Sequence, residues 1–170
     1  VETPPQMWML GSSEDSAVLA ALTGLPYNFA YFINPTIRPD IFDLYRDRFA
    51  PGPNLDAPWT CLTLFSITAD TEEEALLLSR SRDLWYCCLL QGNPGPFPSV
   101  QEALNYPYSP GELRTLEENR GKRAVGTPEQ VKEKLLSLVE QFQADEIMLV
   151  TITHDTQARR RSYELLADVW

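Results

Sequence analysis

The chain has 170 residues, of which 44% are hydrophobic and 22% are charged, and its formal net charge at pH 7 is −10. Length and composition are typical of one globular domain with a sizeable core. The negative charge argues against a surface for nucleic acid or for an anionic membrane, because both need clustered Lys and Arg. No apolar run approaches the roughly 18 residues of a membrane-spanning helix, so we expect no membrane partner.

The cysteines are Cys61, Cys87 and Cys88. Their odd number, with two of them adjacent in a predicted helix, favours free thiols in a reducing compartment, and we expect a cytoplasmic protein. A metal site is not expected, because the chain has a single His.

The first predicted elements are a strand, a turn and a helix. The apolar run Met7–Leu10 is too short for a helix and is bounded by prolines and Gly11. Ser12 or Ser13 can cap the helix that follows, and Gly24 ends it. A strand that enters a helix through small hydroxyl residues leaves N–H groups for an anion, so the turn suits a phosphate. The alternative is an ordinary capped helix.

The rest of the chain continues to alternate strands with helices. Further strands are predicted over 28–33, 59–68 and 146–151, and helices over 37–49, 71–91, 111–119, 127–142 and from Asp155 or Thr156 onward. Residues 93–110 contain five prolines and no clean period, which predicts a long irregular excursion.

This order predicts an α/β fold with parallel strands and right-handed helical crossovers. Two architectures use it: a doubly wound open sheet, and a (β/α)8 barrel, of which the chain would supply four units. The chain begins with Val1 and a strand follows almost at once, so we expect an interior point of a longer polypeptide, or a processed start.

Three motifs then carry a family resemblance. They are Leu10-Gly11-Ser12-Ser13 with Ser16-Ala17, Ala20-Ala21 and Gly24-Leu25-Pro26; Val125-Gly126-Thr127-Pro128-Glu129 with Val131; and Thr153-His154-Asp155 with Ala158-Arg159, Arg161-Ser162-Tyr163-Glu164-Leu165-Leu166-Ala167. In order and spacing they resemble the C-terminal half of the bacterial-luciferase-like flavin-dependent monooxygenases. The resemblance implies half of a (β/α)8 TIM barrel, with residues 1–170 supplying strands five to eight and residues 92–122 forming an insertion after strand seven.

The resemblance also implies a cofactor and a reaction. The cofactor would be reduced FMN or a deazaflavin relative, with its phosphate held by Gly11, Ser12, Ser13 and Ser16. Reduced flavin and O2 would oxidise a small organic, aldehyde-like substrate. Glu14 and Asp15 would oppose a phosphate dianion unless they point to solvent. The catalytic residues stay unassigned, because in this family they come largely from earlier strands.

Other residues at strand ends have two interpretations each. Phe32 and Asn34 follow the second strand, where a barrel faces its ligand, so they could form a flavin or substrate wall or be a core aromatic and a turn residue. His154 beside Asp155 could act in acid–base chemistry or be part of a helix cap.

The chain's partners follow from its missing half. A half-barrel has two open sheet edges, which a separate N-terminal half or a second copy would cover. Without that half we expect an inactive enzyme. The alternatives are a non-catalytic flavin-binding or self-associating module, and an independent open α/β phosphate-binding domain with a different strand order.

Overall fold

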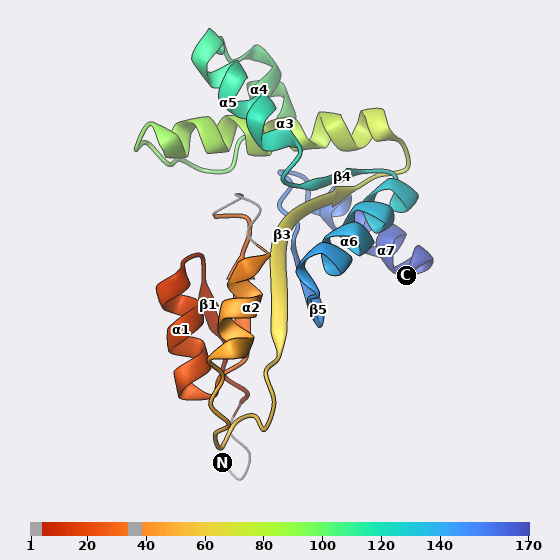
Figure 1. The fold of residues 1–170 in the computed structure, drawn as a ribbon. Helices are drawn as coiled ribbons and strands as arrows, with labels where there is room; N and C mark the ends of the chain where they lie inside the picture. The colour runs from red at the N-terminus through yellow and green to blue at the C-terminus, as the bar shows by residue number, and fades with distance from the viewer. Residues whose placement is uncertain (1–4, 34–38) are drawn as a thin grey trace. The chain divides into compact units, whose positions relative to one another are not determined.

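The computed structural model describes residues 5–33 and 39–170, which form an α/β fold with a parallel sheet. The strands are β1 (Met9–Gly11), β2 (Tyr27–Ala30), β3 (Thr60–Thr68), β4 (Ala124–Gly126) and β5 (Glu146–Val150), drawn in Figure 1. The helices are α1 (Glu14–Thr23), α2 (Asp40–Asp47), α3 (Glu72–Leu90), α4 (Val100–Asn105), α5 (Pro110–Arg120), α6 (Pro128–Phe142) and α7 (Thr156–Val169). None of the helices in the described ranges is both long and apolar enough to cross a membrane.

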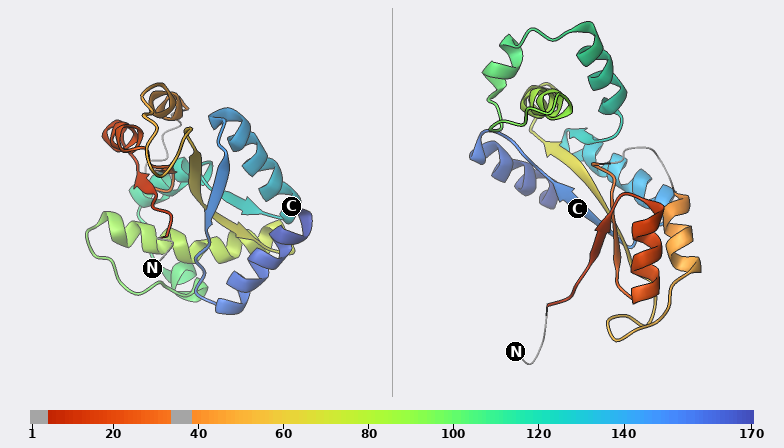
Figure 2. Two further views of the ribbon diagram at one scale, coloured as in Figure 1. Left: turned by 90° about the horizontal axis from the view of Figure 1, so that it is seen from below. Right: turned by 90° about the vertical axis from the view of Figure 1, so that its left-hand side faces the viewer.

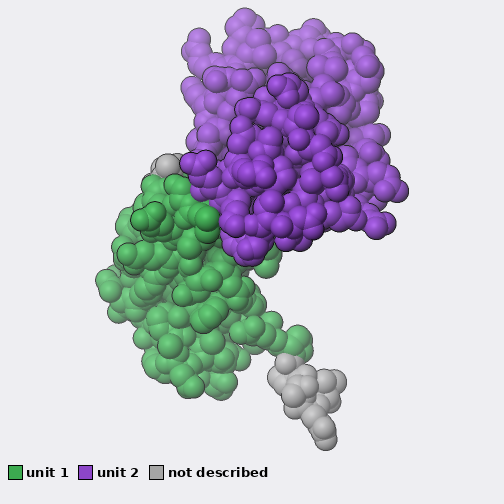
Figure 3. Space-filling model, turned by 90° about the vertical axis from the view of Figure 1, so that its right-hand side faces the viewer, with its two compact units in different colours: residues 1–64, 136–149 green, residues 65–135, 150–170 purple. Residues whose placement is uncertain are grey.

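The chain divides into two compact units, shown in different colours in Figure 3. Unit 1 contains residues 1–64 and 136–149, and unit 2 contains residues 65–135 and 150–170.

Unit 1 is built on a run of parallel strands paired in chain order. β1 pairs with β2 from Met9 opposite Tyr27, and β2 pairs with β3 from Tyr27 opposite Thr60. β5 pairs with β3 as well. The Asp145 carboxylate fixes the start of β3, because its Oδ2 accepts hydrogen bonds from the Thr60 N–H at 2.8 Å and from the Thr60 hydroxyl at 2.7 Å.

Buried aromatic rings fill the core of unit 1. α1 and α2 lie side by side in Figure 1, and α2 directs Phe42 and Tyr45 inward. Phe29 of β2 stacks on Phe142 of α6 at a ring separation of 6.3 Å, and both side chains are almost completely buried. Burying such large rings supplies much of the free energy that stabilises this unit.

Unit 2 is organised around the long helix α3. Figure 2 shows α3 almost end-on in its right-hand view, with α4 and α5 beside it. The end of β3 pairs in parallel with β4, from Ser66 opposite Ala124. The Ser162 hydroxyl of α7 accepts a hydrogen bond from the Thr68 N–H at 2.8 Å, which joins the last helix to the end of β3.

The predicted elements are found with small changes of boundary. β2 ends at Ala30 rather than residue 33, because the chain turns back there and Ile33 N–H bonds to Ala30 O at 3.0 Å. The excursion over 93–110 was expected to be irregular, but it contains α4, whose start is a capping box between Ser99 and Glu102. The strand β4 was not predicted, because three residues are too few for a period to show.

Candidate functional site

The turn after β1 has the local structure that its sequence predicts. Ser13 is the N-cap of α1, in an extended conformation, and its hydroxyl accepts a hydrogen bond from the Ser16 N–H at 3.4 Å. The Ser13 N–H in return donates to the Ser16 hydroxyl at 3.3 Å, so the two serines form a reciprocal capping box. At the other end, Gly24 adopts a left-handed conformation with φ 62°, as a helix-terminating glycine does.

Gly11 is required by the tightness of this turn. A Cβ atom at Gly11 would lie 2.1 Å from Ser16 Oγ and 2.2 Å from Ser16 Cβ, far inside van der Waals contact. The Ser16 hydroxyl sits in that space and donates to the Ser13 carbonyl at 2.6 Å. The glycine therefore lets the first turn of α1 lie directly against the end of β1.

Tyr27 is a further residue of the site, and the sequence interpretation did not single it out. Its side chain is fully buried, its Oη lies 3.1 Å from Ser16 Oγ, and it also donates to the Ser13 carbonyl at 3.4 Å. Burial raises the pKa of the Tyr27 hydroxyl, although the hydrogen bond with Ser16 opposes that shift. Tyr27 thus stays a neutral donor beneath the turn. In the sequence, the position of Tyr27 directly after Pro26, at the start of a predicted extended segment, could have indicated that it lies beside the turn.

The acidic residues of the first turn of α1 face outward. Ser13, Glu14 and Asp15 are all exposed, whereas Gly11, Ser12 and Ser16 are half-buried. The carboxylates can therefore turn into water, and the N–H groups at the start of the helix remain at an accessible surface. Such a helix start has the positive end of its dipole directed outward, which favours an anion.

The remaining candidates are divided between the units. Phe32 is half-buried just after β2, and its N–H donates to the Thr63 carbonyl at 3.2 Å. Asn34 lies outside the described residues. In unit 2, Asp155 caps α7 by accepting from the backbone N–H groups of the next turn, and His154 Nδ1 lies 3.1 Å from the Phe97 carbonyl. Asp155 therefore acts as a helix cap, which is one of the two interpretations of the His154–Asp155 pair.

A small polar group also lies between strands of unit 1. Asn28 is buried, its amide oxygen accepts a hydrogen bond from the Thr63 hydroxyl at 2.6 Å, and its amide nitrogen lies 3.8 Å from Met148 Sδ. These side chains share one face of β2, β3 and β5. Because Met148 is 51% exposed, the face that they share is partly open.

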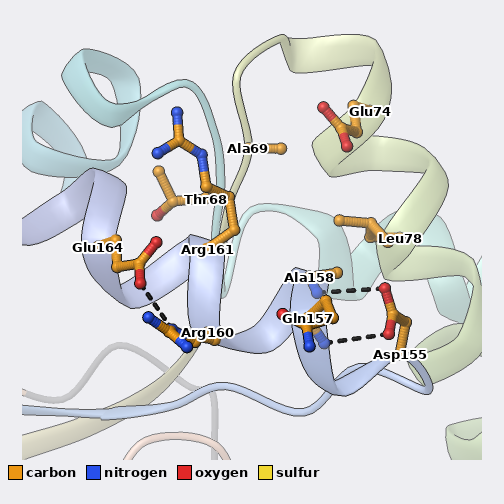
Figure 4. A pocket seen from close by; sticks show the side chains of 10 residues that line it. All are labelled: Thr68, Ala69, Glu74, Leu78, Asp155, Gln157, Ala158, Arg160, Arg161 and Glu164. Atoms are coloured by element: carbon orange, nitrogen blue, oxygen red, sulfur yellow. Dashed lines mark hydrogen bonds and ion pairs between the residues drawn. The ribbon is translucent and has the colours of Figure 1, made fainter.

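Unit 2 contains a larger open pocket, drawn in Figure 4. It has a volume of about 520 Å³ and lies among the end of β3, the first turns of α3 and the outer face of α7. Its charged groups are mostly paired: Arg160 bonds to Glu164 at 2.7 Å, and Arg161 bonds to Asp70 at 2.6 Å. Paired surface charges of this kind do not define the charge of a ligand.

Comparisons with known proteins agree with this fold. No family model matches the chain. The chain is 41% identical to the uncharacterized protein YwcH of Bacillus subtilis over 171 residues, covering all of this chain and 51% of YwcH. It is 34% identical to a luciferase-like monooxygenase of Escherichia coli over 163 residues, covering 96% of this chain and 49% of the enzyme.

Solved structures give the same half-length match. The crystal structure of apo-MsnO8 superposes with a TM-score of 0.86 at 32% identity, over 99% of this chain and 51% of MsnO8. The oxygenating constituent of 3,6-diketocamphane monooxygenase, solved in complex with FMN, superposes with a TM-score of 0.57 at 16% identity, over 96% of this chain and 48% of that one, which shows likeness of fold alone.

The comparisons confirm the resemblance on which the sequence interpretation rested. The chain is an α/β protein similar to the luciferase-like monooxygenases. It spans about half the length of the relatives that it matches.

Proposed function

We propose that the chain is the C-terminal half-barrel of a flavin-dependent monooxygenase that uses reduced FMN and O2 on a small organic substrate. The observation that carries this proposal is the full-length similarity of the chain to half of a luciferase-like monooxygenase, at 34% identity. Related folds have been solved with FMN, as in the diketocamphane enzyme. Bound reduced flavin would supply the electrons that activate O2, and the protein would supply binding and exclusion of water.

The order of the strands supports a half-barrel rather than a doubly wound sheet. β1 pairs with β2, β2 with β3, and β3 with β5, so the strands that open successive βα units are neighbours. A doubly wound sheet instead reverses its strand order at a switch point. In this assignment β3 corresponds to strand seven of the barrel, and residues 92–122, which contain α4 and α5, form the insertion that follows it.

Exposed apolar residues at the sheet edges support a missing partner half. Among the described residues, β1 pairs with β2 alone and β5 with β3 alone. Leu10 of β1 is 54% exposed and Met148 of β5 is 51% exposed. Unpaired apolar edges promote association, so an N-terminal half, or a second copy of the chain, would cover them. The whole barrel would then enclose the substrate.

The turn at Gly11, Ser12, Ser13 and Ser16 fits a flavin phosphate. Its backbone N–H groups start a helix at an accessible surface, and the absence of a side chain at Gly11 keeps the turn narrow. Ser16 and Tyr27 hold each other beneath the turn at 3.1 Å and orient it. Phe32, at the end of the next strand, would form part of the flavin or substrate wall, together with Asn34.

The test is to titrate reduced and oxidised FMN, riboflavin and a deazaflavin into the protein and follow flavin fluorescence. Riboflavin lacks the phosphate, so the ratio of the FMN and riboflavin dissociation constants measures the phosphate interaction alone. Ser13→Asp keeps a good N-cap but adds a negative charge at the turn. We expect it to weaken FMN binding by about tenfold or more and to leave riboflavin binding nearly unchanged.

A matched control is Ser109→Asp, which makes the same change at the N-cap of α5. It should leave both dissociation constants unchanged. Equal affinity for FMN and riboflavin, or equal losses in both variants, would refute phosphate binding at the turn. If no flavin binds at millimolar concentration, the alternative of a non-catalytic module that self-associates through its edges is favoured, and concentration-dependent sedimentation would then detect the association.

A further inference from the structure

A second pocket in unit 2 is lined by an excess of arginine. It has a volume of about 130 Å³ and lies among α3, the end of α5 and β4. Its charged lining residues are Arg80, Asp83, Arg120 and Arg123. Three guanidinium groups therefore face one carboxylate, in a protein whose formal net charge is −10.

The single carboxylate is shared within the cluster. Asp83 Oδ1 accepts from Arg123 Nη1 at 2.6 Å, and the side chains of both residues are almost fully buried. Arg80 Nη1 approaches the other oxygen of Asp83 only to 4.0 Å. Arg120 has a separate partner in Glu117, at 2.8 Å on the exposed surface, where an ion pair contributes little. Each guanidinium carries five N–H donors, and these contacts use few of them.

The neighbouring Arg82 adds to the buried positive charge. Its guanidinium lies between the rings of Phe65 and Tyr86, with ring distances of 4.7 and 4.6 Å, and its Nε and Nη1 atoms have no hydrogen-bond partner among the described residues. Burial, and then the charge of Arg123, lower the pKa of Arg82 to about 10, so it remains charged at neutral pH. Buried charges need compensation, which Asp83 alone does not provide for two buried arginines.

We propose that this pocket binds a small tetrahedral oxyanion such as phosphate, and that the bound anion clamps the end of α5 to α3. The volume fits, because a water molecule takes about 30 Å³ of liquid and the pocket has room for several such volumes. Arginine forks match phosphate oxygens in geometry as well as in charge. Arg80 belongs to α3, whereas Arg120 and Arg123 belong to the segment that leads from α5 into β4, so one anion joins both sides.

The proposal does not rest on flavin binding, since the pocket shares no residue with the turn at Gly11. The anion is phosphate in either of two forms, the free ion or the phosphate group of an ester such as FMN. The experiment titrates inorganic phosphate into the protein by calorimetry, with chloride replaced so that ionic strength stays constant. A parallel titration uses FMN. Hydrogen exchange of residues 110–120 is measured with and without phosphate.

We expect saturable one-to-one binding of phosphate and slower exchange at the C-terminal end of α5. Arg80→Gln and Arg120→Gln are partly exposed and should fold, and each should weaken phosphate binding by about tenfold or more. Arg114→Gln removes the same charge at an exposed position of α5 outside the pocket, and it should leave the dissociation constant for phosphate unchanged. If the two pocket variants also weaken FMN binding, the pocket takes the phosphate of the ester.

Two results would overturn the proposal. One is phosphate binding that does not saturate at constant ionic strength. The other is an equal loss of affinity in Arg114→Gln and in the two pocket variants, which would mean that phosphate responds to net charge rather than to the pocket. Unchanged exchange of α5 on saturation would refute the clamp specifically.

Discussion

Replacing Gly11 with alanine tests how the turn after β1 is built. The new Cβ would lie 2.1 Å from Ser16 Oγ, so the Ser16 side chain must leave its place. The two shortest contacts of that hydroxyl, the 2.6 Å bond to the Ser13 carbonyl and the 3.1 Å contact with Tyr27, would be lost at about 1 kcal/mol each. Overpacking adds about 1–3 kcal/mol, and the lower entropy of the unfolded chain offsets about 0.4–1 kcal/mol. We therefore expect a loss of about 2–5 kcal/mol.

Urea and thermal unfolding measure this loss. For a chain of this length, 1 kcal/mol corresponds to about 2–4 °C, so Gly11→Ala should lower Tm by roughly 4–20 °C. Gly95→Ala is the control, because a Cβ at Gly95 meets nothing within 4 Å. The double variant Gly11→Ala/Ser16→Gly removes the clash and should recover part of the loss. Equal stability of Gly11→Ala and Gly95→Ala, or equal destabilisation of both backgrounds by Ser16→Gly, would show that the clash between residues 11 and 16 is absent.

Three further outcomes can be measured by unfolding. Asp145→Ala should cost about 1–3 kcal/mol, because it leaves the buried Thr60 N–H without its acceptor, whereas Asp145→Asn keeps an acceptor and should cost less. Asp83→Ala should cost about 3–5 kcal/mol, because Arg123 stays buried without its carboxylate, and a double variant that also carries Arg123→Met should recover much of it. Burial raises the pKa of the Cys61 thiol from 9.0 to about 11. The free energy of unfolding should therefore keep the full contribution of this thiol below pH 9 and fall as the pH rises from 9 to 11. The fall should be smaller in Cys61→Ala.

The sequence was sufficient where structure is set by neighbouring residues. Thr71 caps α3, and Ser13 and Asp155 are each one of the two caps that the sequence allowed, because a cap depends on residues within one turn. The same local logic also applies to α4, whose Ser99 cap was overlooked among the prolines. β4 forms instead by pairing with Ser66–Thr68 of β3. The two segments are far apart in the sequence, so no local pattern predicts their pairing.

The candidate sites show the same division. The Gly-Ser turn is contiguous, so its geometry could be inferred from a few residues. Tyr27 supports the turn from the next strand, and the parallel register that places it there is a property of the sheet. The arginine pocket draws on α3 and on the segment after α5, some 40 residues later in the chain, as the Asp83–Arg123 pair illustrates. The sequence analysis did not single out these arginines, because residues so far apart in the chain form no local pattern.

The contacts of Ser16 also divide the roles within the proposed flavin site. Its hydroxyl donates to the Ser13 carbonyl and lies against Tyr27, so its hydrogen-bonding capacity is largely used inside the protein. The capping box also uses the Ser13 and Ser16 N–H groups, so a phosphate would have to contact other backbone N–H groups of the first turn of α1. Ser16 and Gly11 determine where those N–H groups point. Because the exposed Glu14 and Asp15 oppose a dianion, the precision of that backbone arrangement, rather than net charge, must supply the affinity of the turn.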